Sequence, residues 1–298
     1  MIEHIEDHEA VSVDKQVAAK KSTFVSVIVN VGLTISQILA GIVSGSQGLI
    51  ADGIHSLTDL VADFVVLFAN HHSAKEADDD HHYGHQRYET AASLFLGVSL
   101  LVVGLGMLWQ AGHKIIYPVA SGQIQIIALY VALGSLLAKE LLFRYMLSVA
   151  KRVRSSMLVA NAWHARSDAA SSLVVSIGIV GALLGYPILD AVGALIVGLM
   201  VAKTGWDFSW EALHDLMDRS VSEEEHKRIE EIIQSTEGVK GFHALRTRKM
   251  GDMILVDVHI DVDHAATVKQ GHDIALAARN QIMQELPVLD VMTHIDPV

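Results

Sequence analysis

Residues 22–51 read STFVSVIVNVGLTISQILAGIVSGSQGLIA, a stretch that contains no Asp, Glu, Lys or Arg. A helix needs about 20 mostly apolar residues to cross the roughly 30 Å hydrocarbon core of a bilayer. Three more runs of similar length also lack charged residues, namely 90–113, 115–138 and 169–189. Several such runs in one chain of 298 residues predict an α-helical integral membrane protein.

The composition excludes several other classes of protein. Only 19% of the residues are charged, against about a quarter in a soluble domain, and 51% are hydrophobic. The net charge is −12 and the chain has no basic stripe that could bind phosphates, so we expect no nucleic-acid partner. The chain has no cysteine, which excludes disulfides and thiolate metal ligands. Residues 1–21 are acidic and lack an apolar core, which indicates a cytoplasmic tail rather than a cleaved signal peptide.

The apolar segments predict six transmembrane helices within a domain that covers residues 22–209. The expected spans are Ser22–Val43, Leu49–Asn70, Thr90–His113, Ile124–Val149, Met157–Leu184 and Ile188–Asp207. Lys75, Arg87 and Lys151 fall in loops on one side, together with Lys15, Lys20 and Lys21 of the N-terminal tail, whereas the other side holds only Lys114. Because Lys and Arg accumulate in cytoplasmic loops, we expect both termini to lie in the cytoplasm. We expect the protein itself to lie in the cell (inner) membrane.

Residues 210–298 have the pattern of a small soluble domain of the order αββαβ. Ser222–Ser235 and Thr267–Glu285 have helical spacing, and Val288–Asp296 reads as a last strand. A hairpin is predicted from two short alternating segments, Gly241–Lys249 and Met253–Asp263, on either side of Gly251-Asp252. In the second of these strands the apolar residues lie on one face, and Asp257, His259, Asp261 and Asp263 lie on the other.

Two predicted spans carry ionisable residues, which cost about 2.5–3.5 kcal/mol each to insert and are therefore functional candidates. His55 and Asp59 in the second span lie four residues apart, as do His164 and Asp168 in the fifth, so each pair projects from one helix face. Two imidazoles and two carboxylates make a four-coordinate site suited to Zn²⁺ that could also take Co²⁺, Cd²⁺ or Fe²⁺. The alternative is that these residues join helices by hydrogen bonds. Two matched pairs favour the metal site.

Histidines and carboxylates also gather in two places outside the spans. The loop after the second span contains DDDHHYGH at 78–85, in which the candidate metal ligands are Asp78, His81 and His85. The alternative for this loop is a solvated acidic segment. The candidates in the C-terminal domain are His243, His259, His272, His294 and Asp296. Taken singly, these histidines are ordinary surface residues.

Four motifs give the sequence a family resemblance. They are His164-Ala-Arg-Ser-Asp168, His81-His-Tyr-Gly-His85, Leu245-Arg-Thr-Arg248 and His294-Ile-Asp-Pro297. With them, residues 15–298 resemble a cation diffusion facilitator of the bacterial zinc/iron-efflux branch, which is similar to ferrous-iron efflux pumps. The resemblance implies six spans followed by a metallochaperone-like cytoplasmic domain for metal binding and dimerisation.

The resemblance also implies roles for the candidate residues. It makes His55, Asp59, His164 and Asp168 the transport site, Asp78, His81 and His85 a loop site, and the C-terminal candidates a binuclear site. The relatives have Asp in place of His55, which favours zinc here, and Asp52 one turn away could partly restore a carboxylate. The relatives have Lys in place of Arg87, which the resemblance pairs with Asp218 in a charge interlock at the dimer's membrane boundary.

The expected function is therefore proton-coupled export of Zn²⁺ by alternating access in a homodimer, with Cd²⁺, Fe²⁺, Co²⁺ or Mn²⁺ as alternative substrates. Metal ligands must lose protons to bind, so a site that faces a more acidic outside would release its metal. A membrane metal sensor without flux and a helper subunit of another transporter are the alternatives. An intramembrane metalloenzyme is disfavoured because the chain has no His-Glu-x-x-His and four protein ligands leave zinc no open position.

Overall fold

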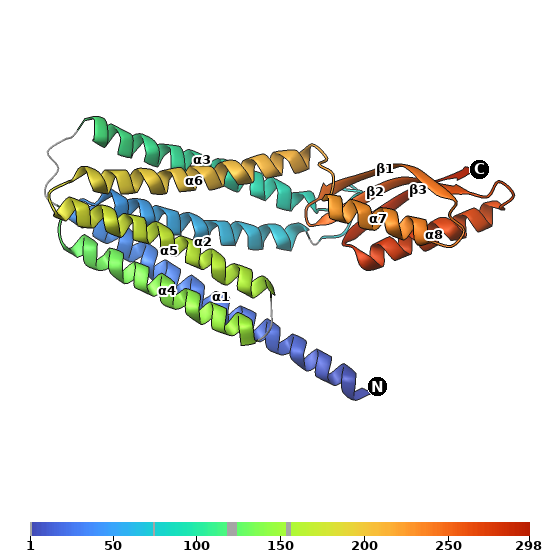
Figure 1. Cartoon of the computed structure of the whole chain (residues 1–298), viewed down its shortest axis with the longest axis horizontal. Coiled ribbons are helices and arrows are strands. Elements are labelled where there is room, and N and C mark those ends of the chain that lie inside the picture. The colour runs from blue at the N-terminus through green and yellow to red at the C-terminus, as the bar shows by residue number, and fades with distance from the viewer. Residues whose placement is uncertain (1, 74, 118–123, 153–155) are drawn as a thin grey trace. The chain divides into compact units, whose positions relative to one another are not determined.

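The computed structural model describes residues 2–73, 75–117, 124–152 and 156–298, except for some side chains within the first, second and fifth helices. The elements in chain order are α1 (Ile2–Ser44), α2 (Gln47–Ser73), α3 (Arg87–Ile116), α4 (Ile127–Arg152), α5 (Ser156–Leu183), α6 (Ile188–Leu216), α7 (Glu223–Ser235), β1 (Gly241–Met250), β2 (Met253–Val262), α8 (Val268–Glu285) and β3 (Val288–Pro297). Figure 1 shows them on the ribbon.

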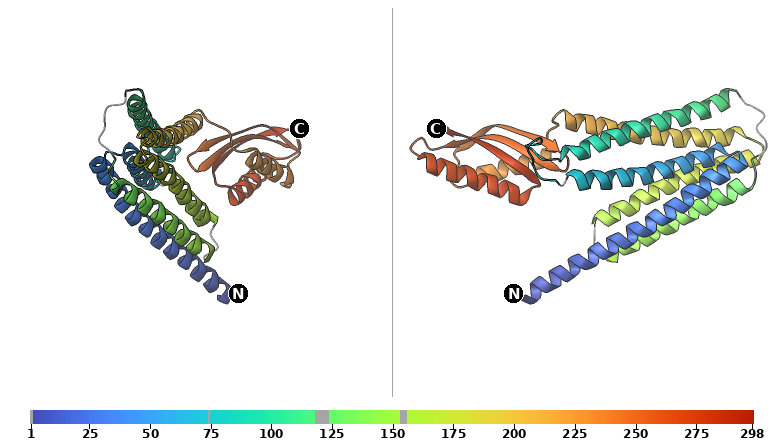
Figure 2. Two further views of the ribbon diagram at one scale, coloured as in Figure 1. Left: turned by 60° about the vertical axis from the view of Figure 1, so that its left-hand side comes forward. Right: turned by 180° about the vertical axis from the view of Figure 1, so that it is seen from behind.

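The chain forms two compact units, which are described separately. The first unit consists of Met1–Phe64 and Ser99–Trp206, and the second consists of Val65–Val98 and Asp207–Val298. In the first unit α1 packs against α4 and α4 packs against α5, and both views of Figure 2 show these neighbours.

Helices α1 to α6 are each at least 26 residues long, which at 1.5 Å per residue exceeds the bilayer core. Over the described residues, four helical segments are long and apolar enough to cross a membrane: Phe24–Ser44, Arg87–Ile116, Ala165–Leu183 and Ile188–Leu216. The predicted membrane class is therefore supported, whereas the predicted count of six spans is not established. Helices α2 and α4 carry charged side chains, among them Asp52, Asp59 and Lys139, and these lower their hydropathy.

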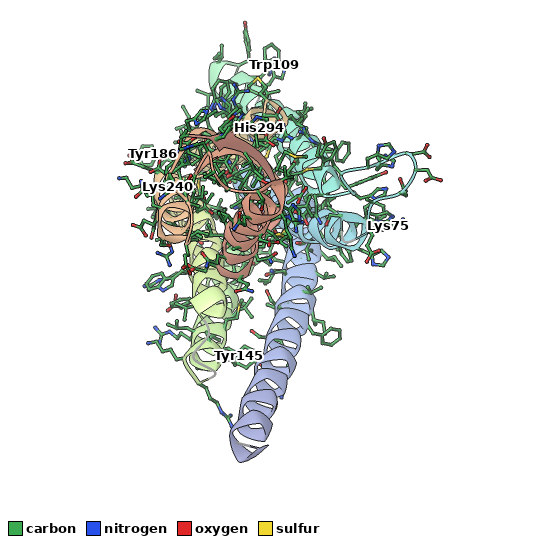
Figure 3. All side chains as sticks on the ribbon, turned by 90° about the vertical axis from the view of Figure 1, so that its right-hand side faces the viewer. Lys75, Trp109, Tyr145, Tyr186, Lys240 and His294 are labelled. Atoms are coloured by element: carbon green, nitrogen blue, oxygen red, sulfur yellow. The ribbon has the colours of Figure 1, made fainter. Side chains whose placement is uncertain are left out.

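The outward faces of the long helices are apolar. Ile177 and Tyr130 are exposed, and the indole of Trp109 is 78% exposed. Figure 3 shows Trp109 and Tyr186 at the periphery of the helices. Many exposed apolar side chains of this kind are unfavourable in water but suit the acyl chains of a bilayer.

Small residues allow α3 and α6 to pack closely. A Cβ on Gly104 of α3 would lie 2.5 Å from the backbone nitrogen of Ala202 in α6, so only glycine fits at this crossing. Close helix approach through small residues is a common way of packing helices in membranes.

A buried carboxylate joins α6 to the start of α2. Asp190 accepts hydrogen bonds from the Ser46 hydroxyl at 2.6 Å and from the backbone N–H groups of Gln47 at 2.7 Å and Gly48 at 3.2 Å. These groups are otherwise unsatisfied at a helix N-terminus, where the macrodipole also favours an anion. The beginnings of the two helices are thereby held together.

The predicted αββαβ order of the C-terminal segment is confirmed, with element ends within two residues of those expected. The sheet has the order β1-β2-β3, in which β1 and β2 are antiparallel and β2 and β3 are parallel. Figure 1 shows α7 and α8 beside this sheet. The apolar face of β2 packs against both helices, and its Val256, Val258 and Ile260 are at most 2% exposed.

Capping boxes begin both helices of this segment. The Ser222 hydroxyl accepts from the Glu225 backbone N–H while the Glu225 carboxylate accepts from the Ser222 backbone N–H, and Thr267 and Gln270 do the same for α8. The β1–β2 turn requires Gly251, whose φ is +63°. A Cβ at Gly251 would also lie 2.7 Å from the Gln86 carbonyl oxygen.

Two helices are longer than the predicted spans. Helix α1 begins at Ile2 and so includes the segment expected as a tail, and α6 continues past Asp207 to Leu216. Hydropathy marks only the part of a helix that suits lipid, whereas backbone hydrogen bonds continue into the polar flanks.

Candidate functional site

Three groups of His, Asp and Glu among the described residues have ligand atoms within 4.8 Å of one another. The first group is His55, Asp59 and Asp168, the second is Asp78, His81 and His85, and the third is His243, His259 and Asp296. Each group matches a cluster of candidates identified in the sequence. The first group lies in the first unit, and the other two groups lie in the second unit.

The transport-site candidates come together from α2 and α5. His55 Nδ1 lies 3.8 Å from Asp59 Oδ2 one turn further along α2, and the His55 and Asp59 side chains are 12% and 31% exposed. Asp168 of α5 completes the group. His164 lies one turn earlier on α5, but its side chain is outside the described residues.

The spacing of these atoms suits a tetrahedral divalent metal ion. Ligand atoms that share a tetrahedral zinc ion at bonds of about 2.1 Å lie about 3.4 Å apart. The three ligand atoms are separated by no more than 4.8 Å, so small side-chain movements would bring them to one ion. The arrangement can therefore hold a metal ion between two membrane helices.

The Asp52 carboxylate does not join this group. It is fully buried in α2 and accepts hydrogen bonds from side chains of three other helices. The sequence-based suggestion that Asp52 could supply an additional carboxylate ligand is therefore not supported by its position. These partners could not be identified from the sequence, because neutral Gln and Ser residues carry no signal in a span and the sequence does not show that Lys139 faces Asp52.

The loop site is organised around Asp78. Its Oδ1 lies 3.1 Å from His81 Nδ1, and its Oδ2 lies 3.4 Å from His85 Nε2. Desolvation raises the pKa of Asp78, but hydrogen bonds from the His81 side chain and from the backbone of His81 and Asp80 outweigh it, so the pKa is below its ordinary value. Asp78 is therefore ionised and available to a cation at neutral pH.

His85 is held in one orientation. Its Nδ1 donates to the Glu76 carbonyl oxygen at 3.1 Å, and its Nε2 lies 3.4 Å from Asp78 Oδ2. The His85 ring also stacks on Tyr88, with centroids 5.8 Å apart. A hydrogen bond to the second nitrogen is how proteins usually fix a metal-binding imidazole. A pocket of about 550 Å³ opens beside these side chains.

Three histidines form a row across the sheet. His243 of β1 pairs with His259 of β2, which pairs with His294 of β3, and successive ring centroids are 4.9 Å and 4.7 Å apart. All three lie on the face opposite the apolar core because side chains alternate along a strand. A bulge follows His243, where Ala244 has a φ of +50°. Sequence alternation cannot predict such a bulge.

Asp296 is the centre of this row. Its Oδ2 lies 2.9 Å from His259 Nδ1 and 3.5 Å from His243 Nε2, and its Oδ1 lies 3.3 Å from His294 Nε2. One carboxylate in contact with three imidazoles can bridge two metal ions. The donors are nitrogen and oxygen atoms, which suit zinc and related divalent ions.

The alternation of residues along β2 predicts Asp261 on this face but does not predict a role for it. Its Oδ1 lies 3.2 Å from His243 Nδ1. The cross-strand partner is Gly241, where a Cβ would lie 2.7 Å from Asp261 Oδ2. The glycine leaves the space in which the carboxylate lies.

His272 is the C-terminal candidate that the structure does not bring into the group. It lies in the first turns of α8, which packs against the apolar face of the sheet. The other histidines lie on the opposite face. Within one protomer, His272 therefore does not share the site of His243, His259 and His294.

Polar contacts join the start of α3 to other parts of the second unit. Arg87 Nη2 lies 2.8 Å from Asp218 Oδ1, so the structure brings the predicted charge pair together. Glu89 accepts from the Ser73 hydroxyl at 2.6 Å and from the Asp252 backbone N–H at 3.1 Å. Glu89 thus links the end of α2 to the β1–β2 turn, which the sequence alone did not reveal.

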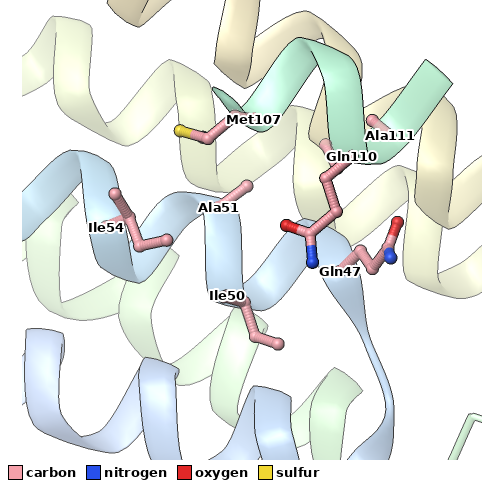
Figure 4. Close-up of a pocket in the computed structure, with 8 residues that line it drawn as sticks. Gln47, Ile50, Ala51, Ile54, Met107, Gln110 and Ala111 are labelled. Atoms are coloured by element: carbon pink, nitrogen blue, oxygen red, sulfur yellow. The ribbon is translucent and has the colours of Figure 1, made fainter. Parts of the chain in front are cut away.

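A small cavity lies near the start of α2. It has a volume of about 20 Å³ and is lined by residues that include Gln47, Ala51, Met107 and Gln110. Figure 4 shows the Gln47 and Gln110 side chains among the residues that line it. This volume accommodates one water molecule and not a larger ligand.

Comparison with known proteins assigns both parts of the chain. Residues 23–217 match the family profile described as the cation efflux transmembrane domain, and residues 221–298 match the cation efflux protein cytoplasmic domain, a dimerisation domain. The chain is 31% identical over 292 residues to the manganese efflux system protein MneP of Bacillus subtilis, covering 95% of this chain and 98% of the relative.

Two other relatives are similar to this chain over most of its length. The chain is 35% identical over 271 residues to the magnetosome protein MamB of Magnetospira sp., covering 91% of this chain and 92% of the relative. It is 34% identical over 283 residues to metal tolerance protein C1 of Arabidopsis thaliana, covering 90% of this chain but only 60% of that longer relative.

Proposed function

The chain belongs to the cation efflux family, the cation diffusion facilitators, and on that premise we propose that it exports Zn²⁺ in exchange for protons as a homodimer. Members of this family are membrane proteins that act as secondary metal transporters and not as enzymes. Efflux of a divalent metal cation is thus the general function, and zinc, protons and the homodimer are the proposed refinements.

The observation that carries the proposal is the group formed by His55, Asp59 and Asp168 across α2 and α5. With His164, one turn from Asp168, it would supply two imidazoles and two carboxylates. A site shared by two helices can change its geometry when the helices move. Alternating access requires such a change in affinity between two conformations.

Zinc is favoured over manganese by the donor atoms. Imidazole nitrogen suits Zn²⁺, whereas Mn²⁺ prefers carboxylate, carbonyl and water oxygen. His55 supplies an imidazole in the candidate site, so its nitrogen donor favours Zn²⁺. MneP is named for manganese efflux, which makes Mn²⁺ the competing substrate in the experiment below, with Fe²⁺, Co²⁺ and Cd²⁺.

Proton exchange follows from the same ligands. An imidazole must be neutral to bind a metal, and a free histidine has a pKa of about 6.5. A site open to an acidic exterior would gain protons and release Zn²⁺. A site open to the cytoplasm would lose them and bind Zn²⁺ again.

The proposed topology has six spans, with α2 and α4 crossing the membrane beside the four more apolar helices. Their ionisable side chains would face the helix bundle, as such residues do in membranes. Residues 1–21 and 210–298 would lie in the cytoplasm and 22–209 in the cell membrane. The basic residues Lys75, Arg87 and Lys151 all fall on the cytoplasmic side in this topology, which supports this orientation.

The position of His272 supports a homodimer. Because α8 lies on the opposite face of the sheet from Asp296, His272 could join the site around Asp296 only from a second copy. A metal ion held by both copies would stabilise the dimer. We propose this role for the site of His243, His259, His294 and Asp296, and a metal-loading role for Asp78, His81 and His85.

The test is metal flux into proteoliposomes that contain the purified protein, with and without an imposed pH gradient. We expect Zn²⁺ flux that increases with the gradient, exceeds Mn²⁺ flux and disappears in Asp168→Ala. Flux without any dependence on the gradient would exclude proton exchange. Zinc binding without flux of any metal would instead indicate a sensor or a helper subunit.

A further inference from the structure

A buried polar network surrounds Asp52, one turn before His55 on α2. Asp52 Oδ1 accepts from the Ser171 hydroxyl at 2.8 Å and lies 3.4 Å from Lys139 Nζ. Asp52 Oδ2 accepts from the Ser172 hydroxyl at 2.6 Å and from the Gln37 amide. Asp52 is fully buried and Lys139 is 3% exposed. The network therefore joins α1, α2, α4 and α5 in the interior of the helices.

These contacts occupy the Asp52 carboxylate. A carboxylate has about four acceptor positions, and four donors approach this one. A metal ligand must keep a lone pair for the ion. Asp52 therefore acts within the protein and not as a ligand of the substrate metal.

Lys139 also contacts the metal-site helix. Its Nζ donates to the backbone oxygen of Asp168 at 3.3 Å, and the Ser171 hydroxyl, whose one proton is shared between this oxygen and Asp52 Oδ1, lies 2.7 Å from it. The turn of α5 that carries Asp168 is thus attached to Asp52 on α2 through Lys139 and the two serines. These contacts fix Asp168 along the helix axis relative to His55 and Asp59.

We propose that Asp52 and Lys139 are a positioning pair for the transport site, which rests on the proposed function of that site. The pair sets the separation of the α2 and α5 ligands without contacting the metal. Misplacing a reacting group by about 1 Å can cost roughly 100-fold in rate, so a positioning pair can matter as much as a ligand. Removing one member leaves the other buried without a partner of opposite charge, whereas removing both does not.

A double-mutant cycle separates these roles. The variants are Asp52→Asn, Lys139→Met and the double variant. The matched control is Glu140→Gln with Arg144→Met, which removes an exposed ion pair of 2.8 Å from the same helix α4. Initial rates of Zn²⁺ flux across a range of concentrations give kcat and KM for each protein, normalised to the folded fraction.

We expect each single variant to raise KM for Zn²⁺ and lower kcat/KM by about 10- to 100-fold. The double variant should recover at least about fivefold over either single variant, because no unpaired charge remains. The control pair should leave both constants within about twofold of wild type. The positioning role would be contradicted if the losses of kcat/KM in the two single variants were independent and simply added in the double variant. It would also be contradicted if kcat and KM per folded molecule were unchanged in the single variants.

A second measurement tests whether Asp52 is a ligand. Absorption of bound Co²⁺ reports the number and type of ligands, and it is recorded in a His81→Ala, His259→Ala background so that the transport site dominates. Asp52→Asn should keep the ligand number of that background, whereas Asp59→Ala should lower it. A loss of one oxygen ligand in Asp52→Asn would overturn the proposal.

The two proposals fail in different ways. If wild type moves no metal, the transport proposal fails, and the Co²⁺ spectra still show whether Asp52 is a ligand. If wild type transports and Asp168→Ala does not, but the cycle shows no coupling between Asp52 and Lys139, only the positioning proposal fails.

Discussion

His243 on β1 and Asp261 on β2 are joined side by side on the polar face of the sheet. His243 Nδ1 lies 3.2 Å from Asp261 Oδ1, and the other ring nitrogen lies 3.5 Å from Asp296. A carboxylate on one nitrogen fixes the tautomer in which the second nitrogen can bind metal. Asp261 therefore orients a histidine that faces the candidate metal position.

The first prediction concerns metal affinity at the sheet. Replacing Asp261 by Ala should weaken zinc binding there by about 10- to 100-fold, as loss of a histidine-orienting partner does elsewhere. Chelator competition on the full chain measures the affinity. Asp263→Asn, an exposed carboxylate just beyond the same strand, is the control. Equal affinities of Asp261→Ala and Asp263→Asn would exclude the orienting role.

The second prediction concerns Gly241. Gly241→Ala should weaken the same binding because its Cβ would lie 2.7 Å from Asp261 Oδ2 and displace the carboxylate. Chelator competition again provides the measurement, and Gly106→Ala, with no atom within 4 Å of its new Cβ, is the matched control. Unchanged zinc affinity in Gly241→Ala would mean that the sheet adapts without moving Asp261.

The third prediction concerns substrate preference. His55→Asp should lower the ratio of Zn²⁺ flux to Mn²⁺ flux by at least about tenfold, because an oxygen donor replaces an imidazole and Mn²⁺ prefers oxygen. Both fluxes are measured in the same proteoliposomes. His113→Asp, near the end of α3 and apart from the three ligand groups, controls for the added charge. An unchanged ratio would show that His55 does not select the metal.

The fourth prediction concerns the stability of α7. Ser222→Ala should reduce the free energy of local unfolding by about 1 kcal/mol, as loss of an N-cap usually does. Amide hydrogen exchange in Glu223–Ser235 of the intact chain reports this energy. Glu224→Gln, which changes a neighbouring carboxylate outside the capping box, should have a smaller effect.

The capping box also predicts a pH dependence. Hydrogen bonds from the Ser222 side chain and backbone lower the pKa of Glu225 below its ordinary value of 4.5. A carboxylate with a lowered pKa stabilises the folded state above its unfolded pKa, and this contribution is lost as the pH falls through the folded pKa. Glu225→Gln should therefore destabilise α7 at pH 7, and its difference from wild type should shrink below about pH 4. A difference that is constant from pH 7 to pH 3 would contradict this assignment.

The fifth prediction concerns the link made by Glu89. Glu89→Ala removes the acceptor of the Ser73 hydroxyl and of the Asp252 N–H, so hydrogen exchange at the β1–β2 turn should accelerate by about fivefold, corresponding to about 1 kcal/mol. Glu76→Ala in the neighbouring loop, whose side chain is exposed, is the control. Equal exchange rates at the turn in both variants would show that the link does not stabilise it.

The sequence by itself determined the membrane class, the αββαβ order and the candidate residues. Charge-free runs of lipid-spanning length have few other uses, and strict alternation along Met253–Val262 required one buried face. The i,i+4 spacing of His55 and Asp59 put both on one helix face, and the structure adds Asp168 to them. These features depend on local periodicity, which a sequence carries directly.

Only the tertiary structure decided what each candidate touches. Asp52, a conspicuous carboxylate in a span, is bonded to Lys139, Ser171, Ser172 and Gln37 from three other helices. Asp261 is beside His243 because the strands pair in one register and Gly241 leaves room, and His272 is separated from the other histidines by the sheet. Helix rotation, strand register and the space left by a glycine arise from long-range packing, and no local pattern in the chain encodes them.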